Sequence, residues 1–283
     1  MVDVQQAPAP RATRPRGRRP WLSAARGRTL MAILVGLLAA SFLLFLGIPL
    51  AALLLHEPPQ QLWNALTQPD TFTALQLSLV TTTASTALSV LFGLPVAWVL
   101  ARARLPGRRL LETLVTMPTV LPPVVAGVAL LLTFGRFGLL GRYLSALGIS
   151  LPFTTVAVVM AQTFVSAPFF INSARAGLEQ LDPRYEQAAY TLRASPFYAF
   201  RRVVLPLIRP ALLSGMGLTW ARALGEFGAT ITFAGNFPGT TQTMPIAIYI
   251  AAETNLDAAV ALSVLVLAVS FALLLALRLG REG

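Results

Sequence analysis

The sequence has no Cys and no Lys, and His56 is its only His. Without Cys, disulfide bonds and thiolate chemistry are excluded, and a single His does not support a His-built metal site or a catalytic triad. All 22 basic residues are Arg. A Walker A loop needs its Lys on the nucleotide phosphates, so this chain has no such loop and any ATP chemistry must come from a partner. Paired carboxylates are also missing, and the chain is not expected to be an enzyme.

Charged residues are scarce as well, at 12% of the 283 residues, whereas 55% are hydrophobic and the mean hydropathy is +0.69. A soluble domain is about 25% charged, so the composition is that of a membrane protein. Six apolar runs are long enough to cross a hydrocarbon core of ~30 Å as helices. They lie at about residues 29–55, 71–101, 110–134, 153–178, 207–234 and 258–279. The sequence therefore predicts an all-α integral membrane protein with six transmembrane helices.

The residues before the first apolar run, 1–28, contain seven Arg and several Pro, a composition typical of disorder. A basic tail can bind nucleic acid or anionic lipid. Directly before an apolar run, this tail is expected to fix the membrane orientation, and no nucleic-acid partner is expected. The membrane domain is predicted at residues 29–283, with its core at about 71–279. A short surface helix is predicted at residues 60–66, between the first two spans.

Hydroxyl and proline residues inside the apolar runs show where a polar pathway could lie. The second run carries hydroxyls that include Thr82 and Thr83. In a membrane, such hydroxyls usually satisfy nearby backbone carbonyls or pack helices together, and more rarely line a pathway. The third run contains Pro118, Pro122 and Pro123, each of which removes a backbone N–H. Because the freed carbonyls must be satisfied by protein or water, this run is either a kinked helix or a broken helix that faces a cavity.

The fifth run holds two ionisable residues, Arg222 and Glu226, four positions apart and so on one helical face. An ionisable residue in a bilayer is costly and usually faces the bundle interior or water, and pairing lowers that cost. One interpretation is a structural ion pair between helices. The other is that Arg222 helps to admit an anion while Glu226 holds it in place. Both stay open, because nothing in the sequence shows which way this face points.

The most polar long segment between two apolar runs is DPRYEQAAYTLRASPFYAFRRVVLP, which begins at Asp182. Asp182 is a candidate N-cap, with Pro183 at the first helical position, where its missing N–H costs nothing. This first helix is expected to run to about Leu192. A Ser-Pro pair at 195–196 repeats the start signal, and Pro206 is expected to end the second helix. The segment therefore predicts two short surface helices.

The Arg residues are distributed unevenly over the two sides that six spans would define. With both termini inside, the tail, the loop at 102–109, the segment at 175–209 and the C-terminus hold 19 of the 22 Arg, whereas the outside connections hold only Arg136 and Arg142. This excess predicts that both termini and the two short helices are cytoplasmic.

Within the segment of two short helices, a spaced set of residues follows a known signature. These residues are Gln187, Ala188, Ala189, Arg193, Val203, Leu205 and Pro206. Their pattern resembles the EAA signature of the membrane subunits of binding-protein-dependent ABC importers. The resemblance implies a type I ABC importer permease fold whose cytoplasmic coupling helices bind a groove of a separate ATPase. The expected contact residues are Tyr185, Glu186, Gln187, Ala188, Ala189, Leu192, Arg193, Leu205 and Pro206.

Two positions depart from that signature. Gln187 stands where Glu is usual, with Glu186 just before it, and Arg193 stands where Gly is usual. Gly eases the turn between the two helices because it tolerates positive φ, so Arg193 implies a different turn or a strained one. Taken without the resemblance, the segment is also consistent with an ordinary cytoplasmic loop of two amphipathic helices.

Four further segments resemble a narrower group within this class of importer subunits. They are RALGEFGATITF at 222–233, NFPGTTQTMPIAIY at 236–249, PTVLPPVVAG at 118–127 and RLPGR at 104–108. They are similar to segments of molybdate permeases over about residues 75–275, with Leu105 in a place often held by Phe. Sulfate and thiosulfate permeases share a looser version of the first segment and of the coupling signature.

This resemblance implies a homodimer in a bacterial or archaeal cytoplasmic membrane that imports molybdate, or tungstate, by alternating access. Two copies of an ATPase would bind ATP and Mg²⁺, an extracytoplasmic binding protein would deliver the oxyanion, and this chain would bind no cofactor. The candidate pathway residues are Thr82, Thr83, Pro122, Arg222 and Glu226.

Two alternatives remain. The same machine could carry sulfate or thiosulfate, because pathway residues discriminate poorly between tetrahedral dianions. The other alternative is an ATP-independent channel or secondary transporter. Such a protein needs coupling-ion ligands in its spans, and Glu226 is the only acid deep in one.

Overall fold

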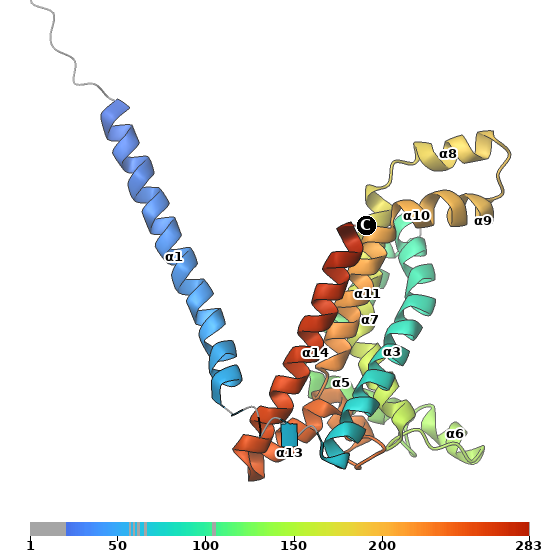
Figure 1. Cartoon of the computed structure of the whole chain (residues 1–283). Coiled ribbons are helices and arrows are strands. Elements are labelled where there is room, and N and C mark those ends of the chain that lie inside the picture. The colour runs from blue at the N-terminus through green and yellow to red at the C-terminus, as the bar shows by residue number, and fades with distance from the viewer. Residues whose placement is uncertain are drawn as a thin grey trace, which may run out of the picture. The chain divides into compact units, whose positions relative to one another are not determined.

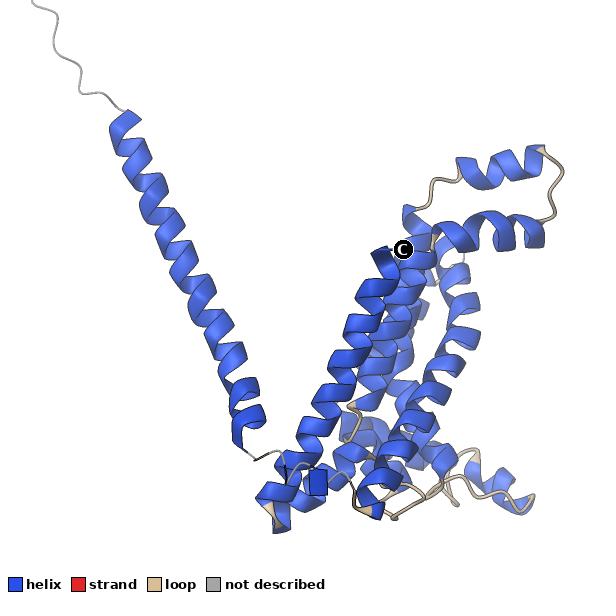
Figure 2. Ribbon diagram, in the orientation of Figure 1, coloured by secondary structure: helices blue, strands red, loops and turns tan. Residues whose placement is uncertain are grey.

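The computed structural model describes residues 21–282, apart from 57, 59, 61–62, 65–66 and 104–105. The tail up to residue 20, most of the helix predicted at 60–66 and the start of the RLPGR segment, with Leu105, therefore lie outside the described residues. Every regular element in the described part of the chain is a helix (Figure 2), as the sequence predicted. The chain divides into two units, Met1–Leu54 and Leu55–Gly283.

The first unit is dominated by one long helix, α1 (Trp21–His56). It begins eight residues before the predicted start of the first span, so the last residues of the predicted tail are helical. The part Met31–His56 is long and apolar enough to cross a membrane. Its large apolar side chains are exposed on all sides, which is the pattern of a helix surrounded by lipid or by other membrane helices.

The second unit is a helical bundle organised around α7 (Thr155–Gln180), with the other helices drawn in Figure 1. These are α3 (Pro69–Arg102), α4 (Arg108–Val120), α5 (Pro123–Phe134), α6 (Gly141–Ala146), α8 (Arg184–Thr191), α9 (Pro196–Ala199), α10 (Leu205–Leu207), α11 (Arg209–Leu224), α12 (Gly228–Ala234), α13 (Met244–Thr254) and α14 (Leu256–Glu282). One end of the bundle carries α8 to α10, and the opposite end carries α5, α6 and α13 (Figure 1).

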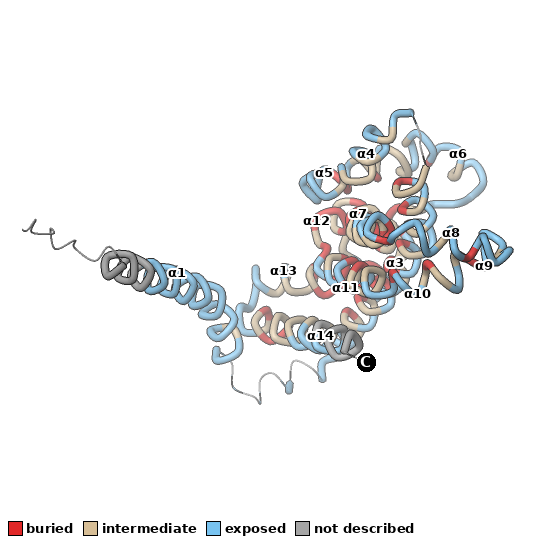
Figure 3. The backbone as a smooth tube through the Cα atoms, turned by 90° about the horizontal axis from the view of Figure 1, so that it is seen from above, coloured by how far each residue is buried: buried red, intermediate tan, exposed pale blue. Residues whose placement is uncertain are grey.

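The core of this unit lies where α3 and α11 pack along α7, as the red segments of Figure 3 show. Phe170 and Leu178 of α7 are fully buried in an apolar cluster with residues of α3. Glycine allows the close approach: a Cβ added at Gly93 of α3 would lie 2.9 Å from the Ile171 side chain, and one added at Gly177 of α7 would lie 2.6 Å from the Cβ of Ala211. Small residues at such crossings are a common basis of helix packing in membranes.

The count of spans agrees with the six that the sequence predicted. Four helices of the described chain are long and apolar enough to cross a membrane: Met31–His56, Pro69–Arg102, Thr155–Gln180 and Leu256–Leu273. Two bent pairs raise the number to as many as six. In one pair α4 and α5 meet at 115°, and in the other the helix Pro196–Leu207 meets α11 at 71°.

The structure corrects the sequence in two places and decides between two alternatives in a third. The fifth apolar run is not one continuous helix, because α11 ends at Leu224 and α12 begins only at Gly228. The third run takes the broken form of its two predicted alternatives, with the break at residues 121–122. The two long connections predicted at 135–152 and 235–257 contain the helices α6 and α13. Short helices of this kind lack the length by which the sequence recognises a span.

Candidate pathway and coupling helices

The two broken runs meet at their breaks, because α5 packs directly on α12. A Cβ added at Gly127 of α5 would lie 2.9 Å from the carbonyl oxygen of Ala229, and one added at Gly228 of α12 would lie 2.7 Å from the Cβ of Pro123. The PTVLPPVVAG and GEFGAT segments therefore touch backbone to backbone. Two segments far apart in the sequence, both singled out by resemblance, form one packed unit at the end of the bundle opposite α8.

Glu226 holds the break between α11 and α12 in place. Its side chain is 1% exposed, one carboxylate oxygen accepts a hydrogen bond of 2.9 Å from the backbone N–H of Ala229, and the other lies 2.8 Å from the Arg222 guanidinium. The carboxylate thus links the last turn of α11 to the first turn of α12. The side chain of Arg222 is 30% exposed. An ion pair of Arg222 with Glu226 is therefore present, but the Glu226 oxygen that faces Arg222 accepts no hydrogen bond from any residue in the described part of the chain.

The five predicted pathway residues do not share one surface. Thr82 and Glu226 are buried, Thr83 and Pro122 are exposed, and Arg222 is half-buried. Thr82 lies 3.5 Å from the side-chain nitrogen of Gln162 on α7. Thr83 points elsewhere and accepts a hydrogen bond of 3.3 Å from the indole of Trp220 on α11. Pro122 stands at the elbow between α4 and α5.

The hydroxyls of α3 largely satisfy their own helix. Thr81, Thr86 and Ser89 each donate a hydrogen bond of 2.8 Å to the carbonyl oxygen four residues earlier. These bonds match the commoner of the two interpretations of membrane hydroxyls, in which the backbone takes up the O–H group.

The segment after α12 ties three helices together. Thr241 accepts a hydrogen bond from the backbone N–H of Phe237 (2.9 Å), and Thr155 of α7 donates one to the carbonyl oxygen of Thr240 (2.9 Å). Ser78 of α3 accepts a hydrogen bond of 2.7 Å from the backbone N–H of Met244, which opens α13. Of the polar side chains of the PGTTQT sequence, that of Thr241 therefore serves the loop's own structure, whereas the buried Thr243 hydroxyl has no hydrogen-bond partner in the described part of the chain.

The two predicted short helices are present; Ser195 is the N-cap of α9 as predicted, whereas the N-cap of α8 is Pro183, one residue after the predicted Asp182. The Asp182 carboxylate accepts a hydrogen bond of 2.9 Å from the backbone N–H of Arg184 at the start of α8. The Ser195 hydroxyl accepts one of 3.2 Å from Tyr198, which opens α9. The second helix ends at Leu207, within one residue of the predicted end at Pro206, and it contains a π-helical turn at Phe200–Val204 that the sequence did not predict. After this turn, α10 leads to the bend before α11.

The two neighbouring Ala of the signature, Ala188 and Ala189, differ in their exposure. Ala189 is 9% exposed, whereas Ala188 is exposed. Beside them lies a hollow of about 810 Å³, lined by Tyr185, Ala188, Ala189, Leu192, Arg193, Ala194, Ser195, Tyr198 and Val203. Leu192, at 83% exposed, is a large apolar side chain that the described part of the chain leaves uncovered. Of the other expected contact residues, Gln187 and Pro206 are exposed and Glu186 and Leu205 are half-buried.

A link that the sequence reasoning missed joins α8 to the bundle. Glu186 of α8 forms an ion pair with Arg102, the last residue of α3. The two side chains are 13% and 23% exposed. The excess of Arg in the loop at 102–109 was interpreted only as a sign of topology. The facing acid in the next inside segment was the signal that could have predicted this contact.

Arg193 makes the turn between α8 and α9 in a left-handed conformation, with φ of +59°. Of the two alternatives that the sequence left, a different turn or a strained one, the structure has the strained one. A left-handed backbone costs a residue with a Cβ roughly 1–2 kcal/mol, and glycine avoids most of this cost.

We therefore expect Arg193→Gly to stabilise the protein, by about 1 kcal/mol after the larger unfolded-state entropy of Gly is subtracted. The measurement is thermal unfolding of the purified chain in detergent. Arg201→Gly is the matched control, because Arg201 lies inside the π-helical turn, where Gly is expected to destabilise. A lower melting temperature for Arg193→Gly than for the unmodified chain would contradict the strain.

The comparisons with known proteins agree with these features. The family described as binding-protein-dependent transport system inner membrane component matches residues 89–279. The molybdenum transport system permease protein ModB of Mycobacterium tuberculosis is 49% identical over 232 residues, which cover 82% of this chain and 88% of that protein. The sulfate transport system permease protein CysT of Salmonella typhimurium is 37% identical over 248 residues, or 84% of this chain and 90% of that protein.

Solved structures show the same fold. A bacterial ABC transporter involved in the import of the acidic polysaccharide alginate superposes with a TM-score of 0.72 at 18% identity, covering 94% of this chain and 99% of that one. A second structure of the bacterial alginate transporter, in complex with a pentasaccharide-bound periplasmic protein, gives 0.70 at 17% identity, covering 92% and 96%. The predicted type I importer permease fold is confirmed. The chain belongs to the binding-protein-dependent transport system inner membrane components, the permease subunits of ABC importers.

Proposed function

We propose that this permease imports molybdate, and tungstate as its close analogue, driven by ATP that a separate ATPase hydrolyses. The observation that carries the proposal is the 49% identity to a molybdenum permease over 82% of the chain. The GEFGAT and PGTTQT segments, on which the resemblance to molybdate permeases rests, add the local support. They form the packed contact of α5 with α12 and the loop that joins α3, α7 and α13.

The proposed assembly is a homodimer of this chain with two ATPase copies and an extracytoplasmic binding protein. The helices α8 to α10 are the ATPase docking element and lie in the cytoplasm, as do both termini. This orientation is supported by the excess of Arg on the proposed inner side. A binding protein is supported by the alginate transporter, which was solved with its periplasmic protein.

In the proposed cycle, ATP binding brings the two ATPase copies together and moves the coupling helices with them. Two links lead from those helices into the bundle, one through the chain itself and one through an ion pair. The continuous helix Pro196–Leu207 runs into α11, whose far end carries Arg222 and Glu226, and the Arg102–Glu186 pair attaches α8 to α3. Movement of α8 to α10 therefore reaches the α5–α12 contact and the hydroxyls of α3, where the pathway is proposed to open.

Within the pathway the oxyanion is bound weakly, because a tight site in the membrane would trap it. Of the five candidate pathway residues, Thr82, Thr83 and Pro122 remain proposed contacts of the ion, and Arg222 and Glu226 are proposed to support the pathway as an ion pair. A second candidate cargo is sulfate, because a sulfate permease is 37% identical over 84% of the chain.

The experiment is uptake of labelled molybdate by cells that lack their own importer and carry this chain with its ATPase and binding protein. We expect ATP-dependent uptake that excess tungstate blocks and excess sulfate does not. The control is the same cells without this chain. If excess sulfate inhibited molybdate uptake as strongly as tungstate does, the transported ion would be assigned as sulfate. ATP-independent uptake would contradict the importer cycle.

A further inference from the structure

A groove between α4 and α7 has a cationic end and an apolar end. It measures about 610 Å³ and is lined by Arg109, Glu112, Thr113, Thr116, Met117, Val120, Leu121 and Arg175. Because Arg109, near the start of α4, and Arg175 of α7 lie at one end of the groove and the apolar residues at the other, the groove has the polarity of an amphiphile. Neither the fold nor the proposed transport pathway accounts for it.

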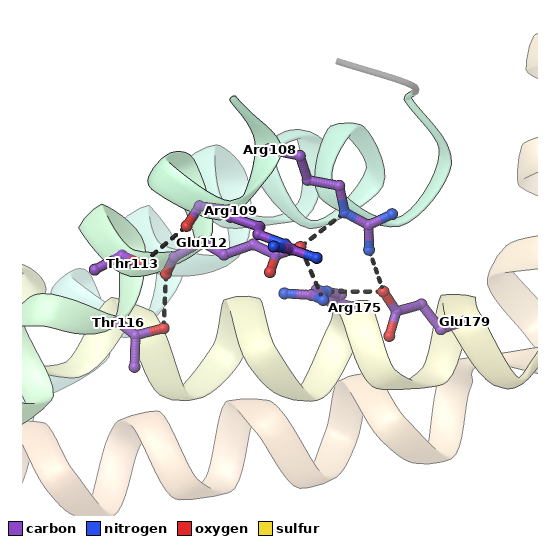
Figure 4. A network of polar contacts seen from close by, with 7 residues as sticks. All are labelled: Arg108, Arg109, Glu112, Thr113, Thr116, Arg175 and Glu179. Carbon is purple, nitrogen blue, oxygen red and sulfur yellow. Dashed lines mark hydrogen bonds and ion pairs between the residues drawn. The ribbon is translucent and has the colours of Figure 1, made fainter. Parts of the chain in front are cut away.

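Four charged residues fix the groove's position in the bundle, and Figure 4 shows them gathered between α4 and α7. Arg108 lies 2.7 Å from both Glu112 and Glu179, and Arg175 lies 3.0 Å from Glu112 and 2.9 Å from Glu179. Going from 108 to 112 on α4 corresponds to going from 179 to 175 on α7, so the two helices run antiparallel here. The charged end of the groove is therefore the end from which α7 leads to α8.

One cation in the groove is not used by this network. Arg109 is exposed and forms no ion pair with any residue in the described part of the chain, although it lines the groove beside Arg175. The five charged residues of the groove and its network have a net charge of +1. They are Arg108, Arg109, Glu112, Arg175 and Glu179. A basic pocket of this kind at the cytoplasmic side of membrane helices attracts anionic headgroups.

The hydroxyls in the groove do not add to anion binding. Thr113 donates its hydrogen bond to the carbonyl oxygen of Arg109 (2.8 Å), and Thr116 donates to that of Glu112 (2.9 Å). Beyond them the lining is Met117, Val120 and Leu121, which offer a small dianion no hydrogen bond. A free oxyanion would therefore find partners only at the mouth, whereas an anion with a hydrocarbon tail would fill the whole groove.

The length of the groove fits one leaflet. From Arg109 to Val120 the helix rises about 16 Å, at ~1.5 Å per residue, and half of a hydrocarbon core of ~30 Å is about 15 Å. Val120 is 80% exposed, so the deep end is open to an acyl chain. We propose that the groove binds an anionic phospholipid of the inner leaflet, with its headgroup phosphate at Arg109 and Arg175 and an acyl chain along Met117, Val120 and Leu121.

The test is binding of phosphatidylglycerol and of phosphatidylcholine to the delipidated full-length chain in neutral detergent, followed by the melting temperature during titration. We expect phosphatidylglycerol to bind more tightly. Arg109→Gln should weaken that binding about fivefold, the effect of one interfacial Arg, and Val120→Asn should weaken it by losing apolar contact. Arg201→Gln, an exposed Arg outside the groove, is the control and should bind as the unmodified chain does.

Four results would overturn the proposal. Equal binding of the two lipids, or unchanged phosphatidylglycerol binding by Arg109→Gln, would show that the groove does not select an anionic headgroup. Displacement of the lipid by molybdate or inorganic phosphate at low concentration would make it a free-oxyanion site. Because the chain has no Cys, Met117→Cys gives a unique thiol, and its cross-linking to a second copy would show that the groove is covered by the partner permease. None of these readouts depends on the transported ion.

Discussion

Ala188→Arg is expected to abolish uptake while leaving the chain folded and inserted. Ala188 is exposed beside the hollow that α8 shares with α9, and the neighbouring Leu192 and Tyr198 offer apolar surface without cover. If this is the surface that the ATPase binds, a long cation there would be buried at the interface without a partner. An unpaired buried charge costs about 3 kcal/mol, or about 100-fold in affinity.

The measurement is co-purification of the ATPase with the tagged permease, together with molybdate uptake. Both should fall to background for Ala188→Arg at unchanged permease yield. Tyr190→Arg is the matched control, because Tyr190 lies on the same helix but does not line the hollow, and it should retain both. Normal co-purification and uptake with Arg at position 188 would show that α8 does not dock in the way proposed.

The choice of Ala188 rather than Ala189 depends on the structure. From the sequence the two form an equivalent small pair at the centre of the first coupling helix. In the structure Ala189 is 9% exposed and is the buried residue of α8. A charged residue at 189 would disturb the folding of the loop itself, so its effect on transport would not report on docking. The burial of one neighbour and not the other is set by tertiary packing, which spacing along the sequence does not reveal.

The ends of the coupling helices were predictable because their signals are local. Asp182 and Ser195 accept hydrogen bonds from backbone N–H groups two and three residues ahead, so each cap depends only on its own short segment. The π-helical turn at Phe200–Val204 was not predictable in this way, because it shifts the hydrogen-bond partners by one residue and such a turn has no simple sequence signal.

The breaks in the membrane spans were predictable only in part. Three prolines predicted an interruption of the third run, yet Pro118 stays inside α4 and the chain breaks only at residues 121–122. In the fifth run no proline marks the break at residues 225–227. There α12 turns away from α11 because Glu226 and the Gly228–Pro123 contact hold it against α5. A break that depends on a partner helix cannot be located from one run alone.

Glu226→Ala is expected to cause the largest loss of folded protein. The substitution leaves the half-buried Arg222 without its partner and removes the acceptor of the Ala229 N–H. Breaking a buried ion pair by removing one member costs about 3–5 kcal/mol, a large part of the stability of most domains. The yield of inserted, monodisperse chain should fall sharply, and the melting temperature of what remains should be lower.

The double variant Arg222→Gln/Glu226→Gln separates the structural role of this pair from a role in the pathway. Glu226→Gln keeps the size of that side chain and an acceptor for Ala229, Arg222→Gln leaves a shorter polar side chain, and the opposite charges are removed together. Replacing both members of a buried pair is often neutral, so we expect the yield to recover to near that of the unmodified chain. We also expect uptake to stay within about threefold, because the two charges cancel in the native pair and contribute little net field to a passing dianion. Uptake below about a tenth at normal yield would contradict this and assign the charge of Arg222 to the pathway, since a tenfold loss is the ~1.4 kcal/mol expected of one direct contact.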